Sequence, residues 1–309
     1  MPIIRRLDRL SEAARGAAVA VGNFDGVHLG HRRIVERLLQ RAKELSGPAI
    51  VFTFDPHPVR LLRPAECPPP LMWTERKAEL LAALGVDSLV AYPTDRALLE
   101  LTAGEFFERI IRDALAARAI VEGPNFYFGH NREGNVALLD RLARDAGMTL
   151  DVVAPVQYAG EIVSSSRIRA QIAAGDVALA AAMLGAPYRI RGMVTHGAGR
   201  GGSLGFPTAN LEAIDVLLPG HGVYAGRVTL DGASCPAAIN VGPNPTFGEH
   251  AVKVEVHLVD RDEPLYGRAL EVEFLERLRA VQSFASPQAL VEQLERDVSA
   301  VRGIAASPS

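Results

Sequence analysis

Short runs of β-branched residues alternate with longer amphipathic segments along residues 17–184, and this alternation constrains the fold more than any other feature of the chain. It is typical of an α/β domain, in which helices cover a parallel sheet. We expect strands at residues 17–21, 49–54, 87–92, 119–122 and 150–153. The four prolines within residues 63–70 predict an irregular loop.

Two helices can be placed between these strands. Ile34, Leu38, Ala42 and Leu45 recur on one face of the segment after the first strand, which predicts an amphipathic helix. Thr102 and Glu105 have the spacing of a capping box, so a second helix is expected to begin there.

Beyond Leu184 the helical periodicity gives way to alternating strands. Residues 222–230, 237–241, 252–258 and 269–274 have the spacing of a small antiparallel barrel, and residues 287–301 predict a closing helix. We therefore expect two domains, residues 1–185 and 186–309, with a frayed tail at 305–309.

The composition excludes several classes of protein. Apolar residues make up 48% of the 309, the net charge is −3, and no apolar run approaches the roughly 20 residues of a membrane-spanning helix. The first residues lack the apolar core of a signal peptide, which predicts a cytoplasmic protein. Cys67 and Cys235 are too few for a disulfide scaffold or a zinc site. The absence of a long basic run argues against a nucleic-acid partner, and the oligomeric state stays open.

A glycine-rich turn follows the first strand. Its sequence is GNFDGVHLGH (residues 22–31), and a helix comes directly after it. Backbone N–H groups at such a turn can bind phosphates, and His28 and His31 can donate hydrogen bonds where charge develops during transfer. An ordinary turn with two surface histidines is the alternative, but the coincidence of glycines, histidines and an acid favours an ATP-phosphate site. Its candidate binding residues are Gly22, Asn23, Phe24, Asp25 and Gly26.

The segment SSSRIR (residues 164–169) offers a second group of phosphate ligands. Serine hydroxyls can cap a helix and donate to a phosphate, and the guanidinium of Arg169 matches phosphate geometry. Taken alone, the segment is better explained as an ordinary serine cap. Paired with the histidine turn, Ser164, Ser165, Ser166 and Arg169 become candidate ATP ligands.

A second glycine-rich loop precedes FPTAN in the C-terminal half. Gly197, Gly199, Gly201, Gly205 and Pro207 are candidate phosphate-binding residues, and the alternative is a flexible loop. Thr208 and Asn210, two apart, could share a Mg²⁺ ion. In VKVEVHL, Glu255 lies on the polar face of an alternating strand, which is either solvated or turned into a cleft as a general base.

Five motifs occur in a fixed order: GNFDGVHLGH, SSSRIR, LGFPTANL, VEVHL and LYGRALEVEFLERLR. In this order they resemble the prokaryotic bifunctional riboflavin kinase/FMN adenylyltransferase (FAD synthetase) family. The resemblance implies a Rossmann-like nucleotidyltransferase domain followed by a riboflavin kinase-like barrel. It further implies Mg²⁺ and the substrates and products ATP, riboflavin, FMN and FAD. By resemblance, His28, His31 and Arg169 stabilise the ATP phosphates, Thr208 and Asn210 bind Mg²⁺, and Glu255 is the general base.

Two further segments match family segments that line the nucleotide and flavin cleft, TFDPHP (53–58) and GPNFYFG (123–129). The resemblance thereby makes His57, Asn125, Phe126 and Phe128 candidate flavin contacts, although a rigid loop and core aromatics are the simpler interpretations. Residues 93–99, PTDRALL, differ from the Phe-Asp pattern common in the family. Two competing hypotheses are an acceptor other than FMN and a flavin-binding regulatory protein.

Overall fold

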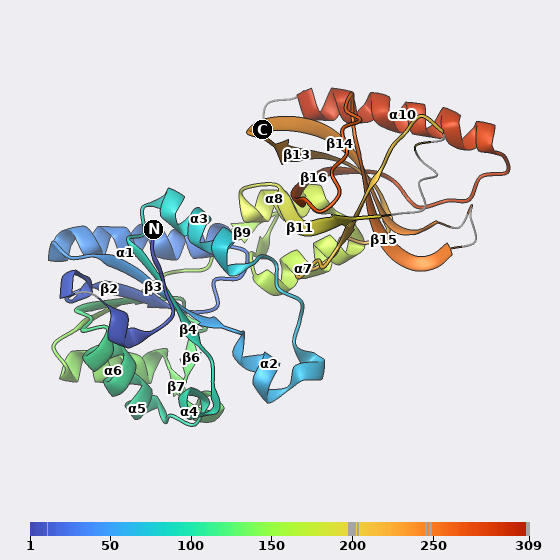
Figure 1. The fold of residues 1–309 in the computed structure, drawn as a ribbon. Coiled ribbons are helices and arrows are strands. Elements are labelled where there is room, and N and C mark those ends of the chain that lie inside the picture. The colour runs from blue at the N-terminus through green and yellow to red at the C-terminus, as the bar shows by residue number, and fades with distance from the viewer. Residues whose placement is uncertain (11, 197–201, 203, 245, 247–248, 307–309) are drawn as a thin grey trace. The chain divides into compact units, whose positions relative to one another are not determined.

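The computed structural model describes residues 1–10, 12–196, 202, 204–244, 246 and 249–306. The chain forms two compact units, one of residues 1–68 and 73–164, the other of residues 69–72 and 165–309 (Figure 1). Helices α7 (Ser165–Ala174) and α8 (Val177–Leu184), which precede the boundary predicted at 185/186, belong to the second unit. Each unit is described by itself.

The first unit is built on a six-stranded sheet of order β1-β4-β3-β2-β5-β8 in which every pair is parallel. This confirms the predicted α/β architecture, and all five expected strands are present within one residue at each end. The two-residue strand β1 was not predicted. The strands are β1 (Ile3–Ile4), β2 (Ala18–Val21), β3 (Ala49–Asp55), β4 (Ser88–Pro93), β5 (Ala119–Glu122) and β8 (Thr149–Val152).

Helices cover both faces of this sheet: α1 and α3 lie on one face, and α5 and α6 on the other (Figure 1). The α-helices are α1 (Leu29–Leu45), α2 (Pro58–Leu62), α3 (Thr74–Leu84), α4 (Arg96–Leu99), α5 (Ala103–Phe106) and α6 (Val136–Asp145). A π-helical segment η4 (Phe107–Ala114) continues α5. Smaller elements are the 3₁₀ turns η1 (Leu7–Arg9), η2 (Glu12–Ala14), η3 (Pro64–Glu66) and η5 (His130–Arg132), and the short strands β6 (Tyr127–Phe128), β7 (Gly134–Asn135), β9 (Gln157–Tyr158) and β10 (Glu161–Ile162).

Two local expectations meet different outcomes in this unit. The capping box is confirmed: Thr102 Oγ1 accepts from Glu105 N, and the Glu105 carboxylate accepts from Thr102 N. The irregular loop at 63–70 is partly wrong, because η3 lies within it. Pro64 begins this turn. Proline suits the first position of a helical turn, because an N–H at that position would have no partner within the turn.

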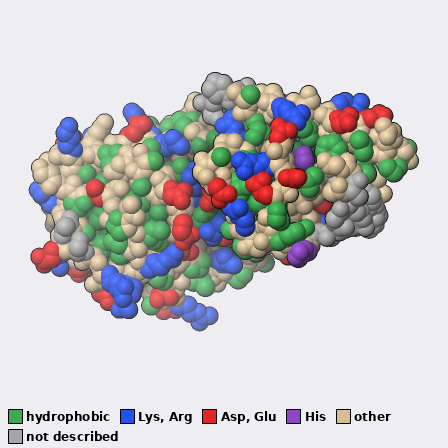
Figure 2. Space-filling model, turned by 45° about the horizontal axis from the view of Figure 1, so that its top comes forward, with side chains coloured by type: hydrophobic (Ala, Val, Ile, Leu, Met, Phe, Trp, Pro, Cys, Tyr) green, Lys and Arg blue, Asp and Glu red, His purple; other side chains and the backbone are tan. Residues whose placement is uncertain are grey.

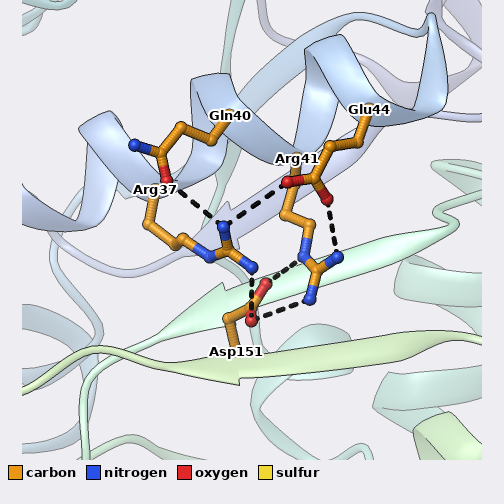
Figure 3. A network of polar contacts seen from close by, with 5 residues as sticks. All are labelled: Arg37, Gln40, Arg41, Glu44 and Asp151. Carbon is orange, nitrogen blue, oxygen red and sulfur yellow. Dashed lines mark hydrogen bonds and ion pairs between the residues drawn. The ribbon is translucent and has the colours of Figure 1, made fainter.

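Helix α1 is fastened to the edge strand β8 by an ionic network (Figure 3). Arg37 Nη2 donates to Asp151 Oδ1 at 3.0 Å, and Arg41 donates to both oxygens of the same carboxylate. Arg41 also donates to Glu44 at 2.7 Å. Burial alone would raise the pKa of Asp151, but the two guanidiniums hold it below its usual value. The network fixes the C-terminal half of the helix whose N-terminus carries the histidines.

The second unit is a closed antiparallel barrel of strand order β11-β12-β15-β14-β13-β16, which confirms the predicted barrel. Its strands are β11 (Tyr188–Thr195), β12 (Ala209–Glu212), β13 (Gly222–Leu230), β14 (Ala233–Asn244), β15 (Glu249–Leu258) and β16 (Ala269–Arg279). The closing helix is α10 (Pro287–Ala306). Val298 and Val301 of α10 pack with Ala225, and Arg279 forms a 2.8 Å ion pair with buried Asp297. The tail expected at 305–309 is wrong for 305–306, which continue α10.

On the face drawn in Figure 2, Lys and Arg side chains are interspersed with Asp and Glu side chains instead of gathering by sign. Among the described residues, no helix is long and apolar enough to cross a membrane.

Candidate active sites

The turn between β2 and α1 has an unusual backbone. Phe24 and Val27 have φ values of 45° and 39°, in the left-handed region that favours glycine, and Gly26 has φ 94°. The turn is tied to β3 at its start, where Gly22 N donates to Phe52 O at 2.9 Å. Arg32 Nε donates to Val27 O at 3.3 Å and ties it to α1. Because Asp25 is also buried, the turn is fixed within the fold and is not a surface loop.

His28 and His31 lie together at the N-terminus of α1. Their rings stack with centroids 3.7 Å apart and planes 16° apart. His28 is the N-cap, and its Nδ1 accepts from His31 N at a long 3.4 Å. An accepting Nδ1 assigns the proton to Nε2, which can donate to a ligand. Burial lowers the pKa of His28 to about 4 and that of His31 well below its usual value. Both rings are therefore neutral at pH 7.

Sequence reasoning assigned no role to three buried polar side chains around this turn, although Thr53 begins the matched segment 53–58. Thr53 ends the buried part of β3, Lys77 comes from α3, and Glu122 ends β5. Glu122 Oε1 accepts from Val21 N at 2.6 Å. The backbone ladder between β2 and β5 ends at Val19 and Ile120, so this carboxyl replaces a ladder acceptor where the strands part. Burial raises the pKa of Glu122 well above its usual value. Because these three residues lie in separate elements, no regular spacing in the sequence links them.

The predicted flavin residues lie in different environments. His57 is the N-cap of α2, and its Nδ1 accepts from Val59 N at 3.1 Å. Asn125 is exposed, and Phe126 is half-buried. Phe128 is 6% exposed within the core and stacks on Phe126 at 5.5 Å. This packing favours the core interpretation for Phe128, whereas Asn125 and Phe126 keep accessible surface.

The serine and arginine segment crosses the division between the units. Ser164 ends the first unit, and Ser165, Ser166 and Arg169 belong to the second. Helix α7 begins at Ser165. Arg169 Nε donates to Pro69 O at 2.9 Å within the second unit. Phosphate binding by these residues stays a prediction.

The second site is a row of polar residues across four barrel strands. Thr195 pairs with Asn210, Asn210 with Glu255, and Glu255 with Asn240. Directly paired residues of antiparallel strands point to the same face, so these four side chains form one row. Asn240 Nδ2 donates to Glu255 Oε2 at 3.4 Å. The expected alternation of β15 is confirmed around Glu255, which is half-buried between buried Val254 and Val256.

The flanks of this row are partly described. Pro207 O lies 2.9 Å from His257 Nδ1, which fixes the chain just before exposed Thr208. Gly205 has φ 85°, and the predicted Gly197, Gly199 and Gly201 lie outside the described residues. Thr195 Oγ1 is buried without a hydrogen-bond partner among the described residues. This unmet oxygen beside the amide and hydroxyl oxygens of Asn210 and Thr208 suits a hard cation such as Mg²⁺, which binds oxygen ligands and substrate phosphates.

Comparison with known proteins decides what these sites belong to. A family model for FAD synthetase matches residues 10–167, and one for riboflavin kinase matches residues 184–305. A bifunctional riboflavin kinase/FMN adenylyltransferase from Pseudomonas fluorescens is 38% identical, with 99% of this chain and 98% of that protein covered. The chain belongs to the bifunctional riboflavin kinase/FMN adenylyltransferase family. It is therefore an enzyme with two activities: the N-terminal module adenylylates FMN to FAD, and the C-terminal module phosphorylates riboflavin to FMN.

Other relatives agree over nearly the whole length. The bifunctional riboflavin kinase/FMN adenylyltransferase of Escherichia coli K12 is 34% identical, with 96% of each chain covered. A solved structure titled as a macrolide-efflux protein from Streptococcus pneumoniae has a TM-score of 0.85 and 31% identity, with 97% of this chain and 98% of that chain covered. The match over both units supports the fold of each.

Proposed function

We propose that FAD forms at the turn between β2 and α1, with His28 and His31 as the groups that bind the ATP phosphates. An oxygen of the FMN phosphate bonds to the α-phosphorus of ATP while the bond from that phosphorus to pyrophosphate breaks. Negative charge then grows on the departing phosphates. The observation that carries the proposal is the neutral, stacked pair of imidazoles at a helix N-terminus, with His28 buried and His31 half-buried. Fixed donors in a desolvated site stabilise developing charge without reorganising.

Backbone groups of residues 22–26 supply the remaining donors at this site. Phe24 and Gly26 have positive φ values, and turns that contain such residues can gather backbone N–H groups around an anion. The half-buried Phe126 offers a ring for stacking beside this edge of the sheet. The neutral His28, whose Nδ1 accepts a hydrogen bond, carries its proton on Nε2 and can donate it without becoming a cation. Positioning and electrostatics, with no covalent enzyme intermediate, account for the transfer.

For the kinase module we propose that Glu255 accepts the proton of the riboflavin 5′-hydroxyl. The hydroxyl oxygen bonds to the γ-phosphorus of ATP, and ADP departs. Asn240 orients the carboxylate through its hydrogen bond, and Thr208 and Asn210 would hold Mg²⁺. When bound, the ion neutralises phosphate charge. The supporting observation is the row across β11, β12, β15 and β14, which places Asn210 directly beside Glu255.

One time course tests both assignments. The purified chain is incubated with riboflavin, ATP and Mg²⁺, and riboflavin, FMN and FAD are separated by chromatography. His28→Ala should accumulate FMN without FAD, and Glu255→Gln should convert supplied FMN to FAD but leave riboflavin unphosphorylated. A wild-type rate of FAD formation in His28→Ala would refute the role of the histidine pair. Omission of Mg²⁺ tests the metal.

The changed segment at 93–99 bears on the acceptor. Asp95 caps α4 by accepting from Leu98 N at 2.8 Å, and buried Thr94 donates to Pro56 O at 2.6 Å. Thr94 therefore supports the loop that carries His57. The changed segment leaves FMN as the acceptor. The cytoplasmic location and the lack of a nucleic-acid partner stay predictions, and use of ATP agrees with the first.

A further inference from the structure

A buried lysine lies beside the turn at residues 22–27, and nothing in the adenylyl-transfer proposal uses it. Lys77 is one of three lysines among 33 basic residues. Its side chain comes from the first turns of α3, and the residue is 8% exposed. Lysine is almost never buried unless it is paired. Among the described residues, however, the ammonium donates to two uncharged acceptors, the Asn23 carbonyl oxygen at 2.6 Å and Thr53 Oγ1 at 3.2 Å.

These bonds form a closed triangle around the Asn23 carbonyl. Thr53 Oγ1, which accepts from Lys77, itself donates to Asn23 O at 3.0 Å. The carbonyl therefore accepts from two buried donors. In a planar trans peptide the C=O and N–H bonds point in opposite directions. Holding the Asn23 carbonyl toward Lys77 and Thr53 consequently turns the N–H of Phe24 away from these two side chains.

The triangle lies next to the residues of the turn that have strained backbone conformations. Phe24 follows the held carbonyl directly and has φ 45°, and Val27 has φ 39°. Non-glycine residues in this region persist only where surrounding structure determines them. The same turn contains Asn23 Oδ1, and the adjoining helix contains His31 Nδ1, both buried without a hydrogen-bond partner among the described residues. Two unmet polar atoms next to a fixed, strained turn indicate a surface prepared for a ligand.

The charge of Lys77 also reaches the histidine pair. The ammonium contributes to the lowered pKa of His31, after burial and the charge of His28. Burial lowers the pKa of Lys77 itself, and the charges of Asp25 and Asp55 oppose this. Lys77 therefore lies within the electrostatic field of the site and adds positive potential where polyphosphate would bind.

We propose that Lys77 is a positioning residue of adenylyl transfer: it holds the Asn23 carbonyl and thereby aims the backbone N–H groups of the turn at a pyrophosphate group. That group is the β,γ-diphosphate of ATP in the forward direction and free pyrophosphate in the reverse. This inference rests on the proposed function of the turn. It adds a residue from a helix outside the motif, and it predicts an effect on diphosphate recognition in particular.

The test compares Lys77→Met with Lys43→Met, in which an exposed lysine in the last turn of α1 receives the same substitution. Reverse reactions from FAD and pyrophosphate measure the two Michaelis constants separately. In Lys77→Met the KM for pyrophosphate should rise about ten- to hundredfold, the loss expected for a charge-assisted hydrogen bond. The KM for FAD should stay within about twofold and riboflavin phosphorylation should be unchanged, since the substitution disturbs only the turn that would bind the pyrophosphate. Lys43→Met should match the wild type throughout.

A second variant keeps the proposal testable if Lys77→Met does not fold. Thr53→Val removes one of the two donors to Asn23 O, so it should raise the same constant by a smaller factor. Equal rises in both Michaelis constants would indicate a general structural role and overturn the proposal, as would an unchanged KM for pyrophosphate in both variants. If Lys77→Met does not fold, Thr53→Val alone decides. Should His28→Ala keep the wild-type rate of FAD formation, the proposed site itself fails. Should His28→Ala abolish FAD formation while the KM for pyrophosphate stays unchanged in Lys77→Met, only the role of Lys77 fails.

Discussion

Gly30 should be intolerant of even the smallest side chain. It lies in the first turn of α1, where a Cβ atom would come within 3.1 Å of His28 Cε1 and 3.2 Å of His28 Nδ1. Carbon atoms in good contact lie about 3.5–4.0 Å apart. The imidazole of His28 would have to move by a few tenths of an ångström. It cannot tilt freely, because the ring stacks on that of His31 with centroids 3.7 Å apart.

The expected cost follows from this displacement. A 1 Å misplacement of a reacting group costs about 100-fold in rate, so a shift of a few tenths should lower the rate of FAD formation by about tenfold. Alanine is also more favourable than glycine in a helix by about 1 kcal/mol, and this gain offsets the loss of stability from the displaced ring. We therefore expect Gly30→Ala to lose adenylylation with little change in Tm.

Gly104 provides the matched control, since it lies in α5 and an added Cβ would meet nothing within 4 Å. Gly104→Ala should keep full FAD formation. FAD made from FMN and ATP is measured by chromatography, and riboflavin phosphorylation by the same protein is the internal reference. A wild-type adenylylation rate in Gly30→Ala, or equal losses in both variants, would show that the ring geometry of His28 does not limit the reaction.

Three further expectations concern pH and the kinase site. Because His28 is neutral when folded, with a pKa of about 4, but protonates below about 6.5 when unfolded, acidification from pH 6.5 to 4 should remove roughly 3 kcal/mol of stability. His28→Gln should flatten this dependence in urea titrations. The raised pKa of Glu122 has the opposite effect on stability. Stability falls as the pH rises above about 4.5, because there the carboxyl ionises only in the unfolded state. Glu122→Gln keeps an acceptor for Val21 N, so its Tm relative to the wild type should be higher at pH 8 than at pH 5. Glu255→Gln should slow riboflavin phosphorylation by at least about 100-fold, the value of a general base, in a coupled ADP assay.

Much of the fold is local enough to be predicted from the pattern of residues. Strands β5 and β13 match their expected bounds. Strand β14 is longer than expected, since Pro236 and Gly242 lie within it. Pro236 is held in register against Arg227 of the neighbouring strand, a tertiary constraint that the pattern of β14 alone does not contain. The four-residue strand β12 is too short to show a period.

The sites divide in the same way. His28 and His31 could be proposed from the sequence because they share one turn, and Glu255 because its strand lies in a motif that resembles the family. Lys77 was missed, since a lysine within TERKAEL is indistinguishable from a solvated helix residue. Thr53 is equally ordinary within an apolar strand. Each becomes informative only when separate elements bring it to the same carbonyl.

The two candidate sites depend on different structural features, backbone conformation in one and strand register in the other. This difference predicts how each site responds to substitution. The adenylyl-transfer site depends on backbone conformation, so it should be sensitive to substitutions that leave every proposed ligand in place, as at Gly30. The kinase row depends on register: Asn210, Glu255 and Asn240 share a face only because each pairs directly with the next. A slip of β15 by one residue would turn Glu255 to the opposite face. Register in this barrel is fixed by the buried Val254 and Val256 on either side of Glu255. The proposed general base is therefore placed by the buried apolar residues beside it.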